Sequence, residues 1–158
     1  VGDMKTLVDL GNDVAEYHGY ANGPVFNTLP VFVNDGNSIK LISAMSYTEE
    51  STDTCYIGLV FYSVDKSERI AVDHKVLTDF SLPIDVEFVD VIPLKGTSKI
   101  AVLTDSSCAI VDTADNMKVT KIINYDLFRW IEPLRLLGTK NRLFALLPNN
   151  DVCCLQVS

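Results

Sequence analysis

The segment Ile84–Asn124 constrains the fold of this chain more than any other stretch. It contains four short runs rich in valine and isoleucine, and turn-forming residues separate them. These runs are Val86–Ile92, Lys99–Thr104, Cys108–Asp112 and Lys118–Ile123. The pattern predicts a four-stranded antiparallel meander. Such a sheet has two faces to bury and is not stable alone, so the flanking sequence must supply further sheets.

Strand patterns of the same kind lie on both sides of this segment. Residues 1–20 fit a hairpin, because Gly11-Asn12-Asp13 would interrupt the competing helix. Four further strands are expected before the segment, at Leu29–Val33, Ile39–Tyr47, Cys55–Val64 and Arg69–Leu77. Three more are expected after it, at Leu134–Leu137, Arg142–Leu147 and Val152–Val157. The sequence therefore predicts an all-β protein.

Composition limits the partners and the compartment. The chain has 158 residues, 47% of them hydrophobic, which suffices for one domain with a real core. Its net charge of −8 repels phosphates, so we expect no direct nucleic-acid binding. The glycines are scattered singly at turns and form no phosphate-binding loop, and we expect no cofactor. No apolar run is long enough to span a membrane. The four cysteines match no zinc-ligand spacing, so we expect buried free thiols and no bound metal. We also expect a cytoplasmic or nuclear location.

A repeated pattern of an apolar strand followed by aspartate runs through the chain. It occurs at Leu7-Val8-Asp9, at Val64-Asp65 and at Val111-Asp112, at intervals of roughly 45–55 residues. We expect these aspartates to cap turns by accepting backbone N–H bonds. The stretch Asp105–Asp112 resembles the third strand of a WD-repeat blade, with Val111 at the tryptophan position.

The resemblance to divergent WD-repeat β-propellers implies two complete four-stranded blades and two partial ones. Residues 1–20 would form two outer strands, residues 25–77 and 84–124 the complete blades, and residues 132–158 three inner strands. We expect the rest of the propeller to come from a longer protein. The edge at Val152–Val157 would then be unpaired, and we expect the chain alone to be largely insoluble until an upstream segment is co-expressed.

No group of residues predicts catalysis, so we expect this chain not to be an enzyme. His18 and His74 fit surface positions, and Asp85, Glu87 and Asp90 fit a solvated strand edge. Recognition character is found instead in the stretch between residues 125 and 135. The expected partner-binding residues are Tyr125, Phe128, Arg129, Trp130 and Arg135. In the alternative, Phe128 and Trp130 fill the seam between blades.

The function these observations favour is a non-catalytic interaction scaffold, a subunit of an intracellular multiprotein complex. Its partners would be proteins, including the remainder of its own propeller, and not a membrane. Two alternatives stay open. One is an enzyme whose active site lies at the propeller channel and uses residues outside this chain; the other is an independent small β-rich domain.

Overall fold

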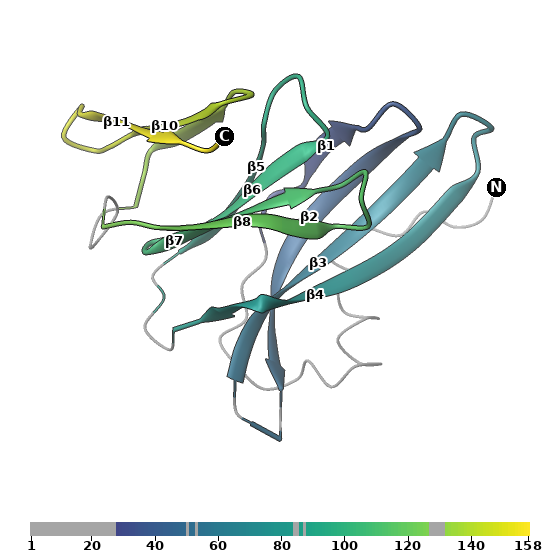
Figure 1. Ribbon diagram of the computed structural model, residues 1–158, viewed down its shortest axis with the longest axis horizontal. Coiled ribbons are helices and arrows are strands. Elements are labelled where there is room, and N and C mark those ends of the chain that lie inside the picture. Colours follow the sequence, from purple (N-terminus) through teal and green to yellow (C-terminus); the bar gives the residue numbers. More distant parts are fainter. Residues whose placement is uncertain (1–27, 50, 53, 84–85, 87, 127–131) are drawn as a thin grey trace.

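The computed structural model describes residues 28–49, 51–52, 54–83, 86, 88–126 and 132–158. These residues form eleven strands in three antiparallel sheets and contain no helix (Figure 1). Within these described parts of the chain, no helix is long and apolar enough to cross a membrane. The expected all-β class is confirmed.

Each sheet is an up-and-down meander, in which strands adjacent in sequence are hydrogen-bonded neighbours. The first sheet consists of β1 (Val31–Asn34), β2 (Ser38–Glu49), β3 (Thr54–Asp65) and β4 (Ile70–Leu82). The middle sheet consists of β5 (Val89–Pro93), β6 (Lys99–Thr104), β7 (Ser107–Asp112) and β8 (Lys118–Asn124). The third sheet has β9 (Arg135–Gly138), β10 (Arg142–Leu146) and β11 (Val152–Gln156). All eleven predicted strands in the described residues are confirmed, most within a few residues at each end.

The largest difference from the predicted boundaries lies in β4. The sequence predicts an end at Leu77, but the strand continues to Leu82. A register shift beside Tyr56 and Ile57 inserts extra residues into β4, so Leu77 pairs with Ile57 and Leu82 with Cys55. This bulge keeps Leu77 and Leu82 buried in the same core, which a strictly alternating strand could not do.

The middle sheet buries both of its faces. Ile100 and Val102 pack toward the first sheet, whereas Ala101 and Leu103 pack toward the third, and all four side chains are fully buried. Successive residues of a strand point to opposite faces, so the continuous apolar run of β6 requires a neighbour on each side. The expected need for flanking sheets is confirmed.

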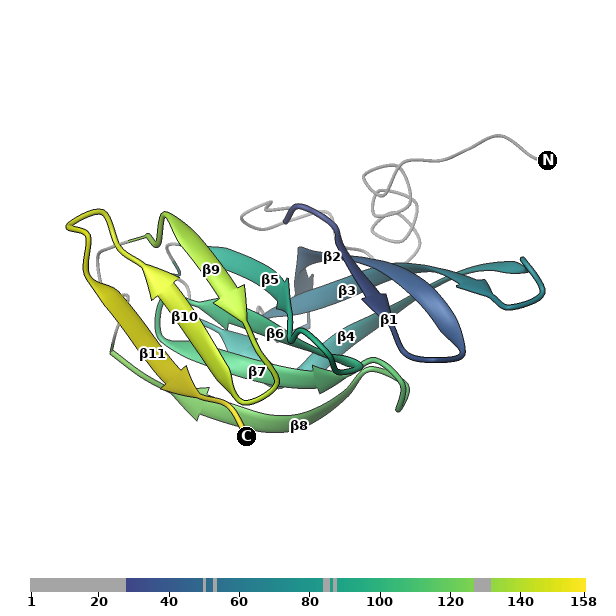
Figure 2. The same ribbon diagram turned by 90° about the horizontal axis from the view of Figure 1, so that it is seen from above.

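The first strands of the three sheets lie beside one another. Leu94, next to β5, forms a parallel bridge with Gly138 of β9, and the Lys95 N–H donates to the Gly138 carbonyl at 3.1 Å. A Cβ at position 138 would lie 2.5 Å from the Pro93 carbonyl oxygen, which explains the glycine. Figure 2 shows the third sheet lying over the middle sheet, with β9 on the β5 side and β11 on the β8 side.

This succession of stacked four-stranded meanders is that of a partial β-propeller. Two complete four-stranded sheets are followed by a three-stranded one. The division into blades at residues 25–77, 84–124 and 132–158 stays a prediction. The predicted strands in residues 1–20 lie outside the described residues.

Candidate protein-interaction face

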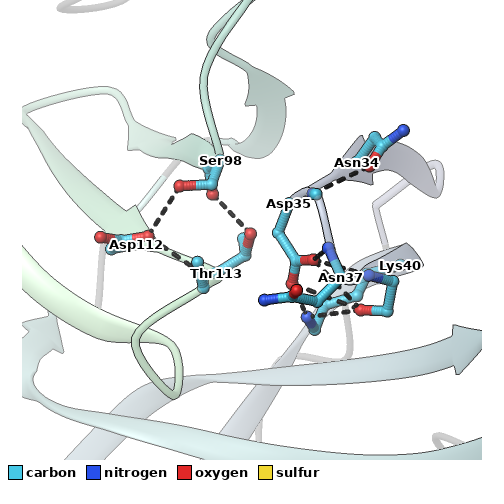
Figure 3. Close-up of polar contacts among 10 residues, drawn as sticks. Asn34, Asp35, Asn37, Lys40, Ser98, Asp112 and Thr113 are labelled. Carbon is cyan, nitrogen blue, oxygen red and sulfur yellow. Dashed lines mark hydrogen bonds and ion pairs between the residues drawn. The ribbon is translucent and has the colours of Figure 1, made fainter. Parts of the chain in front are cut away.

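Two of the three repeat aspartates cap turns, as expected. The Asp112 carboxylate accepts hydrogen bonds from the Ser98 hydroxyl and the Ala114 N–H, both at 3.0 Å (Figure 3). Asp65 accepts the N–H groups of Ser67 at 2.8 Å and Arg69 at 2.9 Å. These bonds fix the strand ends of the first and middle sheets. Asp9 lies outside the described residues.

A third aspartate holds the hairpin between β1 and β2. Asp35 accepts the N–H groups of Ser38 at 2.8 Å and Asn37 at 2.9 Å and forms an ion pair with Lys40 (Figure 3). Burial opposes ionisation of Asp35, but Lys40 and the two N–H groups outweigh it and lower the pKa to about 2. Gly36, at φ +88°, completes the turn. The carboxylate is therefore ionised and fully engaged in local structure.

The third sheet separates its residues into an inner and an outer face. Leu136, Leu143 and Ala145 pack against the middle sheet with Cys153 and Leu155. The alternate residues of the same strands point the opposite way. We call them the outer face: Arg135, Leu137, Arg142, Phe144, Leu146, Val152, Cys154 and Gln156.

The outer face is apolar at its centre and basic at two ends. Leu137 is 58% exposed and Val152 is 65% exposed, and a shallow depression of about 290 Å³ lies between Arg135, Phe144 and Val152. Arg135 pairs in register with Leu146, and Arg142 pairs with Gln156, so both cations flank the apolar centre. No aspartate or glutamate belongs to this face. An apolar surface rimmed by arginine is the composition of protein interfaces.

The β11 strand forms the outer edge of the third sheet, and no described strand pairs with its other side. The Leu147 N–H donates to Asp151 and the Val157 N–H to Asn141, both at 2.9 Å. Along an antiparallel strand, residues that hydrogen-bond to the partner strand alternate with residues that do not. Because Asp151 and Val157 bond to the β10 side, Cys153 and Leu155 also bond to β10. The main-chain groups of Val152, Cys154 and Gln156 face away from β10. We call this side of β11 the free edge.

The predicted partner-binding residues divide into three groups. Arg135 is exposed and lies on the outer face. Tyr125 is half-buried and packs against the apolar cluster between the middle and third sheets. Its hydroxyl lies 2.6 Å from the Thr104 carbonyl oxygen and 2.7 Å from that of Ser107. Burial raises its pKa, and the nearby Cys108 and Asp105 add to the effect. Phe128, Arg129 and Trp130 lie outside the described residues, so their contact with a partner stays a prediction.

Sequence reasoning missed the apolar residues that accompany Arg135. Leu137, Phe144 and Val152 were assigned only to strands, although their alternation with Leu136, Leu143 and Cys153 was readable. That alternation places one set of apolar residues on each face of the third sheet. It does not tell which set meets the middle sheet.

The cysteines, Asp90 and the histidines differ in their burial. Cys108 is fully buried, which raises the pKa of its thiol to about 12, while Cys154 is exposed; all four cysteines are free. The expectation of buried thiols therefore holds for Cys108 only. Burial also raises the pKa of Asp90, helped by Glu132 and opposed by its bond from the Val91 N–H. His74 lies beside Asp73, and His18, Asp85 and Glu87 are outside the described residues.

A groove of about 890 Å³ runs along the ends of β1, β5 and β9, where the propeller channel would be. Its walls include the apolar side chains of Phe32, Leu94 and Leu137. Asp35 and Lys95 are the charged residues among its described lining residues, and the hairpin already binds the Asp35 carboxylate. The described part of the groove therefore has an apolar wall, and its one carboxylate is engaged in the β1–β2 hairpin.

Comparison with known proteins finds similarity among solved structures. No family model matches the chain, and no curated protein matches it. Among solved structures, the β-propeller domain of Nup133 from Vanderwaltozyma polyspora is similar over 89% of this chain, with 11% identity and a TM-score of 0.48. The match covers 41% of that chain, so this protein spans about two-fifths of its length.

Proposed function

We propose that this chain is a non-catalytic interaction module, a subunit of an intracellular protein complex, and that the outer face of its third sheet binds a protein partner. The observation that carries the proposal is the exposure of the apolar residues Leu137 and Val152 on this face. A well-packed sheet in this molecule buries its apolar residues on both sides, as the middle sheet does. The outer face offers the same kind of residues without a described neighbour.

The chemistry of the face supports a protein partner over a small molecule. The depression is shallow, and its walls come from three adjacent strands of a single sheet. Small-molecule sites are concave and enclose most of the ligand, whereas protein interfaces are broad with a polar rim. Arg135 and Arg142 supply that rim and favour an acidic partner surface.

Four free cysteines support a reducing compartment. Secreted domains commonly join their cysteines, whereas cytosolic and nuclear proteins keep them reduced. We therefore propose that the complex resides in the cytoplasm or the nucleus. The rest of a propeller would be one of the partners.

The test is a comparison of two charge insertions at matched exposure. Leu137 on the outer face and Ile70 on β4 are both 58% exposed. Leu137→Glu should remove stoichiometric partners from affinity-purified complexes, since it places a carboxylate in an apolar interface; Ile70→Glu should retain them. Quantitative mass spectrometry measures both. Retention of every partner by Leu137→Glu, with unchanged melting temperature, would contradict the proposed face.

Trp130 provides a second test of the recognition stretch. If it anchors a partner, Trp130→Ala should weaken binding by more than about 2 kcal/mol and leave the melting temperature near wild type. A large drop in melting temperature would instead assign Trp130 to the seam between sheets.

A further inference from the structure

We propose that one end of the middle and third sheets is a docking surface for an acidic segment of a partner protein. The surface consists of Lys95, Lys99, Lys118 and Lys140, of which Lys99 is half-buried and the others are exposed, and we call it the lysine end. It is separate from the outer face of the third sheet. The inference therefore goes beyond the proposed function and does not rest on it.

The charged residues of these two sheets are segregated by strand end. The β5–β6, β7–β8 and β9–β10 turns lie at the same end of the stack (Figure 2). The described charged residues at this end are mainly cationic: Lys95, Lys99, Lys118, Lys140 and Arg142, with Asp112 and Asp115. Those at the opposite strand ends are mainly anionic: Asp90, Asp105, Asp126, Glu132 and Asp151, with Arg135. Although the chain has a net charge of −8, these sheets therefore gather their cations at one end.

Main-chain hydrogen bonds hold the three turns of the lysine end together. The Lys95 N–H donates to the Gly138 carbonyl at 3.1 Å, which joins the β5–β6 turn to the third sheet. The Thr113 N–H donates to the Ser98 carbonyl at 3.0 Å, which joins the β5–β6 turn to the β7–β8 turn. The lysine side chains therefore extend from connected backbone, which lowers the ordering cost of binding a partner.

Three of the lysines border the seam between the middle and third sheets. Lys99 and Lys118 each pair in register with Asp112, so they lie on the same face of the middle sheet. Ile100 packs toward the first sheet, so the preceding Lys99 is on the side of the third sheet. Lys140, in the β9–β10 turn, is at the same end of that sheet. Cations from two sheets therefore converge on one surface.

The lysine end has little neutralisation from within the chain. In the described residues, the close pairs of acidic and basic side chains are Asp35 with Lys40, Asp65 with Arg69 and Asp73 with His74. All three pairs belong to the first sheet. Asp112 accepts the Ser98 hydroxyl and the Ala114 N–H, so its carboxylate is occupied by local donors. Gathering like charges costs free energy, and the carboxylates of a partner would offset that cost.

The charge pattern favours an acidic polypeptide segment over nucleic acid. A long polyanion would extend its phosphates beyond the lysine end toward the anionic remainder of the chain, which repels them. A short acidic segment can place its carboxylates at the lysines alone. The opposite charges at the two strand ends would orient its approach.

The test titrates a short, fluorescein-labelled, glutamate-rich peptide with the complete chain and follows fluorescence anisotropy. The glutamine counterpart of the peptide should bind at least about tenfold more weakly, and binding of the glutamate peptide should weaken several-fold between roughly 50 and 200 mM salt. In NMR spectra of the unmodified chain, the amides of Gly96 and Thr139 should shift on binding. The amide of Ser67, in the β3–β4 turn of the first sheet, should not.

Two turn lysines provide matched substitutions. Lys140 and Lys66, in the β3–β4 turn, are both exposed. Lys140→Glu should weaken binding of the glutamate peptide by at least about threefold, since it replaces an attraction by a repulsion, and Lys66→Glu should change it by less than about twofold. Both variants should keep the wild-type melting temperature. Equal weakening by the two would refute a localised surface and leave only an effect of net charge.

Other results would also overturn the proposal. Absence of peptide binding at low salt, or equal binding of the glutamine peptide, would remove the acidic occupant. A single-stranded DNA oligomer or a phosphatidylserine vesicle that shifts the same amides and binds more tightly than the peptide would assign the surface to nucleic acid or to a membrane. Self-association that Lys140→Glu abolishes would identify the acidic end of a second copy as the occupant. Leu137→Glu leaves the lysine end unchanged, so failure of the outer-face test and failure of this one are distinguishable.

Discussion

Asp35 should make the stability of this protein depend on pH in the acid range. Its side chain is 4% exposed and accepts two backbone N–H bonds beside the Lys40 ammonium. Asp35→Asn keeps the size of the side chain but removes the charge that these donors stabilise. The hairpin between β1 and β2 should consequently lose stability at neutral pH.

The magnitude follows from the pKa. The fall from 3.8 to about 2 corresponds to an upper value of about 2.5 kcal/mol at roughly 1.4 kcal/mol per unit. The hairpin lies at the surface, where solvent screens charges, so we expect Asp35→Asn to cost about 1–2 kcal/mol. Because the folded pKa is lowered, this contribution is complete above about pH 4 and disappears as the pH falls through about 2.

Urea unfolding of the wild type and Asp35→Asn at a series of pH values measures this difference. The gap in unfolding free energy should be about 1–2 kcal/mol at pH 7 and should close progressively below about pH 4. Asp79→Asn is the control, since it removes the same charge from an exposed position on β4. A gap that stays constant down to about pH 2.5 would refute the electrostatic reasoning and leave only a steric effect.

Three further substitutions test individual contacts by the same unfolding measurement. Asp112→Ala should cost about 0.5–2 kcal/mol, because the Ala114 N–H loses its acceptor; an unchanged unfolding energy would contradict its role as a cap. Gly138→Ala should cost about 1–3 kcal/mol, since its Cβ would collide with the Pro93 carbonyl oxygen, and a neutral result would show that the two sheets can separate freely. Tyr125→Phe should cost about 1 kcal/mol through the lost hydroxyl bond, and a gain in stability would argue against that bond.

Local sequence determined the strands and the need to cover both faces of the middle sheet. Lys99–Thr104 is apolar at consecutive positions, so both faces of its strand had to be covered whatever the rest of the chain did. The turn residues around Asp35, Asp65 and Asp112 bind main-chain N–H groups only a few positions away. Such short-range bonds depend on local spacing alone, which is why the strand order and the capping aspartates could be predicted.

Tertiary structure decided which surfaces remain open. In β9–β11 both alternating sets are largely apolar, so the sequence could not tell that Leu136 and Leu143 would meet the middle sheet while Leu137 and Phe144 would face outward. The extension of β4 past Leu77 likewise depends on a bulge set by its pairing with β3. Each of these features depends on contacts between distant segments, and alternation within one strand carries no information about which neighbour covers which face.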